Sequence, residues 1–240
     1  MPAAAHAAWG TGLVAWLPLV GAVIGGLVAA VAVGASLVLP PMLAGLLGAA
    51  AWVLLTGGLH LDGVADCGDG LACAASREKR LEIMKDPRLG SFGALALGLV
   101  VLVKIFALGS LCAGGTNQTG EVRLILACVL AAVLGRAQIP LAFATQKMAR
   151  PGGLGETVKN TMGKWELWIA LVISAALCAG LRWRGLAAFL AAALVFLALT
   201  SIARTRLGGV TGDVVGALVE TTEAAVLVVF CAHAPQGWNL

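Results

Sequence analysis

The chain has 240 residues, of which 60% are hydrophobic and only 12% are charged, and its mean hydropathy is +0.96. Because globular domains carry about 25% charged residues, this composition excludes an ordinary soluble enzyme and predicts an integral membrane protein. The formal net charge is only +4. We expect no nucleic-acid partner from so small an excess, and the placement of the charges is more informative than their sum.

Apolar segments long enough to cross about 30 Å of hydrocarbon as helices recur along the whole chain. In chain order, we expect spans at 12–38, 42–57, 91–113, 122–144, 165–181, 186–203 and 213–232. The first is too long for the apolar region of a signal peptide and has no basic segment before it, so we expect it to be retained. The sequence therefore predicts an all-α polytopic membrane bundle of about seven transmembrane helices, in one domain covering residues 1–240.

Basic residues cluster in three connecting segments, which are 76–90, 145–164 and 204–212. Short loops rich in Lys and Arg stay in the cytoplasm. Only Arg182 and Arg184 break this pattern. We therefore expect a cytoplasmic amino terminus and an outer carboxyl terminus. The segment with three aspartates (57–71), ARPGGLGE and GGVTGDVVGALVETTE then all fall on the cytoplasmic face, where three separated segments can build one site.

The segment GGLHLDGVADCGDGL, residues 57–71, contains Asp62, Asp66 and Asp69. If the segment is helical, a rotation of about 100° per residue places the three carboxylates on one face about 60° wide. Carboxylates packed so closely near a membrane repel one another unless a cation neutralises them. Mg²⁺ suits them, because it takes carboxylate oxygens together with water or substrate phosphates.

Two other interpretations of this segment remain open. Its glycines are compatible with a solvated loop whose aspartates cap neighbouring helices. A zinc site made of His60, Cys67 and Cys73 is the second alternative, although the spacing matches no common ligand pattern. We favour magnesium because the aspartates are denser than capping requires.

Near the carboxyl end, Asp213 and Glu220 stand seven residues apart and hence on one helical face. We expect Asp213 to be the N-cap of the last span. Glu220 lies about two turns deeper, where burial in lipid is costly, so it should face a metal, a partner or a wet cavity. The predicted metal ligands are therefore Asp62, Asp66, Asp69, Asp213 and Glu220, with Glu223 as a weaker candidate.

Basic and glycine-rich positions near these acids suit a phosphate ligand. Lys85 and Arg88 lie in IMKDPRLG, and Arg150 leads RPGGLGE, whose glycines would let backbone N–H groups approach a diphosphate. For any one of these residues, positive-inside topology is the simpler explanation. Two more basic residues, Lys104 and Arg136, lie at apparent membrane depth, where each is expected to pair with a carboxylate or, for Lys104, to snorkel.

The stretch TGGLHLDGVADCGDGL, followed by SREKRLEIMKDPRLGSFGALAL, resembles the cobalamin synthase family, the adenosylcobinamide-GDP ribazoletransferases. LGGVTGDVVGALVETTE is similar to the second signature of that family, and WLPLVGAVIG is similar to its first span. The resemblance covers nearly the whole chain. It implies a magnesium-dependent enzyme of the cell inner membrane, with its active site facing the cytoplasm, that joins adenosylcobinamide-GDP to α-ribazole or its 5′-phosphate and releases GMP.

The resemblance also implies site residues. The acidic signature of the family maps onto His60, Asp62, Asp66 and Asp69, its basic element onto Arg88 and Gly90, and its terminal acid pair onto Asp213 and Glu220. Together with the residue chemistry, this gives His60, Asp66, Asp69 and Arg88 as the expected catalytic residues, and our hypothesis for the general base is Asp66 or Asp69. From the basic and glycine-rich positions, the expected substrate-binding residues are Lys85, Arg88, Arg150, Gly153, Thr211 and Gly212. The expected partners are the two substrates and the lipid bilayer, and the resemblance is compatible with a homo-oligomer or an association with other cobamide-pathway enzymes.

Two other functions remain as alternatives. A CDP-alcohol-type phosphotransferase also clusters aspartates at a membrane face, but its D-G-x2-A-R signature has Ala and then Arg where this chain has Asp66 and Cys67. An ion-coupled transporter would more plausibly place acids near the bilayer midplane and show corresponding interrupted spans in two halves. The sequence shows no clear internal repeat.

Overall fold

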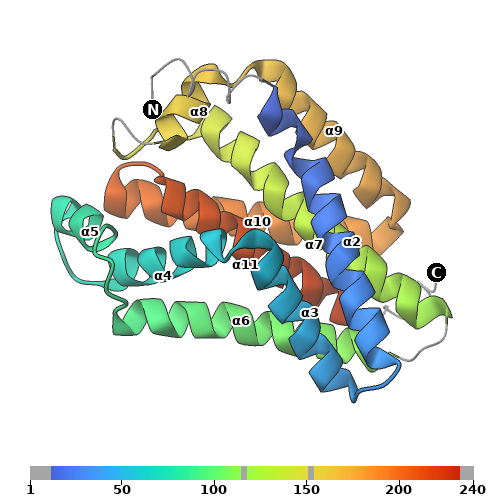
Figure 1. Ribbon diagram of the computed structural model, residues 1–240. Coiled ribbons are helices and arrows are strands. Elements are labelled where there is room, and N and C mark those ends of the chain that lie inside the picture. Colours follow the sequence, from blue (N-terminus) through green and yellow to red (C-terminus); the bar gives the residue numbers. More distant parts are fainter. Residues whose placement is uncertain (1–11, 115–117, 151–153, 233–240) are drawn as a thin grey trace.

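The computed structural model describes residues 12–114, 118–150 and 154–232 (Figure 1). The elements are the 3-10 helix η1 (Leu13–Trp16) and the helices α2 (Leu17–Ser36), α3 (Pro41–Thr56), α4 (Leu59–Ala72), α5 (Arg77–Ile83), α6 (Ser91–Cys112), α7 (Gln118–Thr145), α8 (Leu154–Thr161), α9 (Lys164–Gly180), α10 (Arg182–Leu207) and α11 (Gly212–Cys231). Within the described ranges, the only β pairing is an isolated bridge between Met148 and Val210. The predicted all-α architecture is confirmed.

The described helices include five that are individually long and apolar enough to cross a membrane. These are η1 with α2, then α6, α7, α10 and α11. Two further pairs, α3 with α4 and α8 with α9, each qualify together but bend by 95° and 97°. The count of about seven spans is reached when each bent pair is taken as one span, and a multi-pass membrane bundle is confirmed.

The bend between α3 and α4 is made by two consecutive glycines. Gly57 and Gly58 have φ angles of +63° and +68°, in the left-handed region that glycine adopts without steric cost. Their backbone N–H groups donate to the carbonyls of Leu54 and Val53, which closes α3. The chain then starts α4 in a new direction, so the three aspartates lie on a helix of their own and the solvated-loop interpretation of this segment is wrong.

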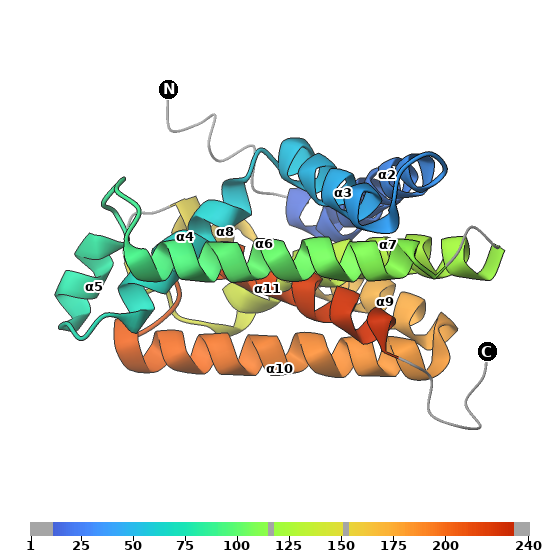
Figure 2. The same ribbon diagram turned by 90° about the horizontal axis from the view of Figure 1, so that it is seen from below.

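Helices α7 and α11 form the centre of the bundle. Figure 2 shows α11 running between α6 and α10, and it also packs against α4 and α7. Small residues allow close approach elsewhere in the core, since a Cβ added to Gly21 or Gly25 of α2 would come within 2.5 Å of a carbonyl oxygen of α7. The outer faces of α2, α6 and α10 expose large apolar side chains, as a lipid-facing surface requires.

The three segments predicted to share one face do meet at one end of the bundle (left in Figure 1). Arg77 Nε donates to the carbonyl of Leu207 at 2.7 Å, and the backbone N–H of Ala149 donates to the carbonyl of Val210 at 2.8 Å. We call residues 76–90, 146–150 and 208–211 the three-loop end. Two short helices form in segments that were expected to be loops: α5 belongs to the three-loop end, and α8 follows its second segment.

Candidate active site

Helix α4 touches the beginning of α11 through glycine. A Cβ added to Gly63 would lie 2.5 Å from the carbonyl oxygen of Asp213, and one added to Gly216 would lie 3.4 Å from the Cα of His60. The two backbones are therefore in direct contact, which is how small residues bring membrane helices together. This contact places the aspartate face of α4 beside the first turn of α11.

Three of the five predicted metal ligands come together at this contact. Asp66 and Asp213 are half-buried and Asp62 is exposed. The strongest charge repulsion on Asp66 comes from Asp213 across the helix contact and the next from Asp62, one turn away on α4, while Arg150 is the nearby cation. The Nη2 atom of Arg150 lies 3.8 Å from Oδ2 of Asp213. We call Asp62, Asp66 and Asp213 the acidic cluster.

Asp69 has a different task from its neighbours on α4. Its two carboxylate oxygens accept hydrogen bonds from the backbone N–H groups of Gly90 and Gly93, both at 2.8 Å. Gly90 is the N-cap of α6, so Asp69 satisfies free donors in the first turn of that helix. A Cβ at either glycine would lie 2.3 Å from an Asp69 oxygen. The capping interpretation therefore holds for this one aspartate.

Glu220 lies in a second group of charges, deeper along α11. Lys104 of α6 pairs with both Glu220 and Glu223, and Arg136 of α7 pairs with Glu223. All four side chains are buried, with Glu220 only 1% exposed. We call these four residues the buried ionic cluster. Glu220 thus faces a cationic partner, one of the outcomes expected from its depth.

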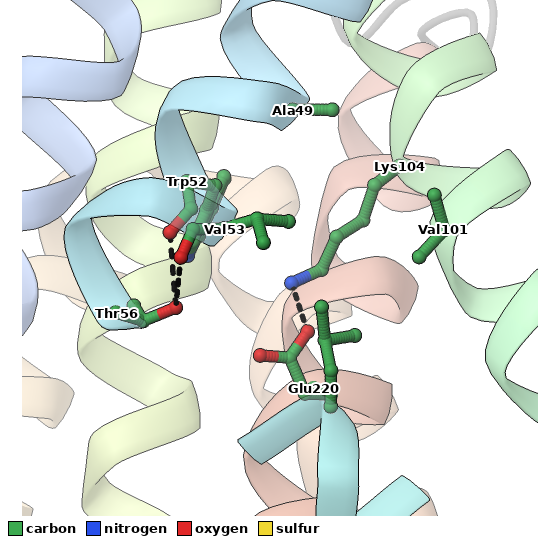
Figure 3. A pocket seen from close by; sticks show the side chains of 8 residues that line it. Ala49, Trp52, Val53, Thr56, Val101, Lys104 and Glu220 are labelled. Carbon is green, nitrogen blue, oxygen red and sulfur yellow. Dashed lines mark hydrogen bonds and ion pairs between the residues drawn. The ribbon is translucent and has the colours of Figure 1, made fainter. Parts of the chain in front are cut away.

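Figure 3 shows Lys104 and Glu220 of the buried ionic cluster beside Trp52 of α3. Lys104 reaches from α6 towards Glu220 of α11, and its Nζ lies 4.7 Å from the centre of the Trp52 ring on α3. The expectation that Lys104 and Arg136 pair with carboxylates is confirmed. The alternative, in which Lys104 snorkels to the interface, is wrong, because its side chain is 6% exposed.

His60 lies between the two groups of charges. It begins the first turn of α4, it is half-buried, and its Nδ1 is buried without a hydrogen-bond partner among the described residues. Lys104, Arg136 and Glu220 are the charges that act on it. The alternative of a zinc site made of His60, Cys67 and Cys73 is wrong, because no three His, Cys, Asp or Glu side chains of the described chain are arranged to hold a metal ion by themselves.

The N-terminus of α11 is open towards the acidic cluster. Its N-cap is Thr211, whose Oγ1 accepts from the N–H of Val214 at 3.3 Å and donates to Asp213 at 3.1 Å. The prediction that Asp213 is the N-cap is therefore wrong; Asp213 belongs to the first turn. A Cβ on Gly212 would meet nothing within 4 Å. Free N–H groups at a helix N-terminus are a natural site for phosphate.

Arg150 faces the same region. Its Nε and Nη2 atoms are buried without a hydrogen-bond partner among the described residues. It can therefore donate to an anion bound beside Thr211 and Gly212. Gly153, predicted to act with it, lies outside the described residues.

Lys85 and Arg88 lie at the three-loop end but outside the acidic cluster. Both are exposed. Arg88 donates from Nε to Oδ1 of Asp86 at 2.9 Å and from Nη2 to Oδ2 at 2.6 Å. These hydrogen bonds lower the pKa of Asp86 to about 2. Arg88 is thus held by its own loop, and the structure does not bring it against Asp66.

The acidic cluster fits Mg²⁺ only together with a phosphate ligand. No described group of three acid, His or Cys side chains forms a complete metal site. Mg²⁺, however, is usually held by one or two carboxylates and completes its octahedron with water and substrate phosphates. The carboxylates of α4 and α11 supply such oxygens, and the N-terminus of α11 with Arg150 supplies donors for the phosphates.

Two glycines of this site were not singled out from the sequence. Gly63 and Gly216 set the contact between α4 and α11, and without that contact Asp66 and Asp213 would not be neighbours. The sequence did contain a sign of this contact, because both glycines lie inside segments expected to be helical. Glycine destabilises a helix interior, so its presence there indicates a role in packing.

Residues 1–231 match the cobalamin-5-phosphate synthase family. The chain belongs to this family. A protein of Pseudomonas paraeruginosa named adenosylcobinamide-GDP ribazoletransferase is 43% identical over 215 residues, which cover 88% of this chain and 83% of that protein. Proteins of the same name from Pseudomonas aeruginosa and Roseiflexus are 42% and 38% identical, covering 79% and 92% of this chain and 74% and 80% of their own lengths. No solved structure matches the chain significantly.

Proposed function

We propose that this member of the family is an adenosylcobinamide-GDP ribazoletransferase, a transferase of late cobalamin biosynthesis. The observation that carries the proposal is the contact between α4 and α11, which joins the two acidic motifs into one cluster beside an open helix N-terminus. Relatives with this name are similar over most of their length. Such a site suits a diphosphate substrate, because it offers carboxylates for a divalent cation and donors for phosphate oxygens.

In this proposal, the diphosphate of adenosylcobinamide-GDP binds at the N-terminus of α11 and Arg150. A ribose hydroxyl of α-ribazole, or of its 5′-phosphate, attacks the phosphorus next to cobinamide, and the bond from that phosphorus to GMP breaks. Asp66 takes the proton of the attacking hydroxyl. We choose Asp66 over Asp69 because both oxygens of Asp69 already accept backbone hydrogen bonds.

Mg²⁺ is the proposed cofactor, and Asp62 and Asp213 would hold it beside Asp66. When bound, it would neutralise charge on the diphosphate and on the departing GMP. Arg150 would neutralise part of the same charge. The contact between α4 and α11 at Gly63 holds Asp66 beside Asp213. Glu220 is left out of the metal set, because Lys104 neutralises it.

We place the enzyme in the inner membrane, with the three-loop end facing the cytoplasm. The support is the density of basic residues there, since short cytoplasmic loops collect Lys and Arg. The basic residues at this end include Arg77, Arg80, Lys85, Arg88 and Lys147. The acidic cluster then opens to the compartment that contains the nucleotide substrate.

The test is release of GMP by the purified protein in liposomes. We expect release to require adenosylcobinamide-GDP, α-ribazole and Mg²⁺ together, and no transfer from CDP-diacylglycerol. Asp66→Asn should lower turnover by at least about 100-fold, the scale of general base catalysis. Asp69→Asn is the matched control, with turnover within about tenfold of the wild type. Normal turnover in Asp66→Asn would refute the assignment of the base.

A further inference from the structure

A large cavity lies at the end of the bundle opposite the acidic cluster. It has a volume of about 730 Å³ and is bordered by the end of α6, the start of α7, the turn between α9 and α10, and the end of α11 (right side of Figure 1). We call it the far-end cavity. Helix α11 runs between the two sites, and its 20 residues span about 30 Å. The cavity and the acidic cluster therefore lie at opposite ends of the bundle.

Two arginines line the far-end cavity without an acidic partner. Arg123 donates from Nε to the carbonyl of Phe230 at 2.7 Å, while the Nε of Arg184 is buried without a hydrogen-bond partner among the described residues. Both guanidinium groups line the same cavity. Neither forms an ion pair within the part of the chain that the structure describes. Two adjacent uncompensated cations favour a bound anion.

Apolar grooves lead from the far-end cavity into the membrane-spanning region. One, of about 190 Å³, runs between α7 and α9 and shares Leu126 and Leu181 with the cavity. The other, of about 310 Å³, runs along α6 and α11 and shares Ser110 with it. The first groove is lined by aliphatic side chains and Gly180, where an added Cβ would meet nothing within 4 Å.

We propose that the far-end cavity binds one anionic phospholipid, with its phosphate between Arg123 and Arg184 and one acyl chain in each groove. The paired cations select a negatively charged headgroup, because a zwitterionic lipid brings no net charge to compensate them. The two apolar grooves select a lipid over free phosphate, which would leave both grooves unfilled. This site lies about 30 Å from the acidic cluster and does not depend on the proposed transfer reaction.

The experiment uses the full-length protein purified from vesicles of phosphatidylglycerol and phosphatidylcholine in equal amounts. Native mass spectrometry then counts the lipids that stay bound. The wild type should retain one phosphatidylglycerol in preference to phosphatidylcholine. Arg184→Gln should weaken this retention about tenfold, the loss expected for a hydrogen bond to a charged group. Arg182→Gln is the matched control, because Arg182 is exposed at the same turn and does not line the cavity.

A second variant tests the grooves without changing charge. Gly180→Leu puts a side chain into open space between α7 and α9, so the protein should fold normally and lose the bound lipid. Equal retention of both lipids by the wild type would overturn the proposal. So would an equal loss in Arg182→Gln, or thermal stabilisation by inorganic phosphate alone that matches the effect of phosphatidylglycerol. Transfer activity is measured in parallel, and its absence would count against the proposed function only.

Discussion

The acidic cluster and the buried ionic cluster share helix α11 and lie about two turns apart, yet their carboxylates are in opposite situations. Glu220 and Glu223 are buried, and Lys104 and Arg136 neutralise them. The carboxylates of Asp62, Asp66 and Asp213 are partly accessible, and Arg150 is the cation beside them. The difference shows that residue type and helical spacing do not assign a task. Unbalanced, accessible charge suits a ligand, whereas paired, buried charge fixes helices against one another.

The largest effect is expected from breaking the buried ionic cluster. Lys104→Met removes the cation that serves both Glu220 and Glu223, and leaves buried charge uncompensated. Removing one partner of a buried pair costs about 3–5 kcal/mol. The thermal midpoint in detergent should fall sharply, and the yield of folded protein with it.

The control for that variant is a double substitution. Lys104→Met with Glu220→Gln removes the cation and one anion together, so it should recover part of the lost stability. A double variant no more stable than Lys104→Met would show that the pair does not couple α6 to α11.

The next largest effect is expected at the helix contact. Gly63→Ala places a methyl group against the carbonyl of Asp213, so α4 must move away from α11. Overpacking of this kind costs about 1–3 kcal/mol, and turnover should fall because Asp66 moves with α4. Gly98→Ala is the matched control, since its added Cβ meets nothing within 4 Å. Equal turnover in the two variants would show that the contact between α4 and α11 is not needed for catalysis.

A smaller effect is expected from Asp69→Asn. The amide keeps one acceptor and turns a donor towards the second backbone N–H, so one hydrogen bond to Gly90 or Gly93 is lost. Loss of a capping interaction costs about 1 kcal/mol. Chemical denaturation should show this loss, and hydrogen exchange should rise in the first turn of α6. Faster exchange confined to α4 would contradict the capping role.

The smallest effect on stability is expected at the exposed pair of Asp86 and Arg88. Because the pKa of Asp86 is lowered to about 2 in the folded protein, the pair contributes above the ordinary carboxyl pKa and is lost as the pH falls through about 2. Solvent screens so exposed a pair and its contribution is small, so Arg88→Gln should leave the thermal midpoint nearly unchanged at neutral pH. A rise in KM for adenosylcobinamide-GDP without a matching fall in kcat would mark Arg88 as a substrate-binding residue.

The sequence was sufficient for the architecture and for part of the site. Apolar segments and basic loops led to a helical bundle in which three segments meet at one end, because hydropathy and charge are local properties. The prediction that Asp213 and Glu220 lie on the same helix was also correct, yet the two carboxylates have different partners. Which partner a carboxylate meets depends on the neighbouring helix, and no local pattern contains that information.

Backbone geometry was the other element that the sequence did not predict. The expected helix 42–57 matches α3 in its bounds, but the sequence did not predict that the chain bends by 95° at Gly57 and Gly58, or that α3 qualifies as a span only together with α4. The role of Asp69 followed from the same turn, because only the new direction of α4 brings it to the start of α6. Two consecutive glycines indicate that the chain can turn at that point. The angle between α3 and α4, however, is set by how the two helices pack.

Helix α3 has 16 residues, hence a length of about 24 Å, whereas the hydrocarbon layer is about 30 Å thick. Helix α3 is therefore too short to cross alone, and it qualifies as a span only together with α4, into which the chain turns by 95°. Because both halves of this broken span are helical, their backbone hydrogen bonds stay satisfied within the span. The second half can thus carry polar side chains such as Asp62 and Asp66 without exposing unpaired backbone groups to lipid.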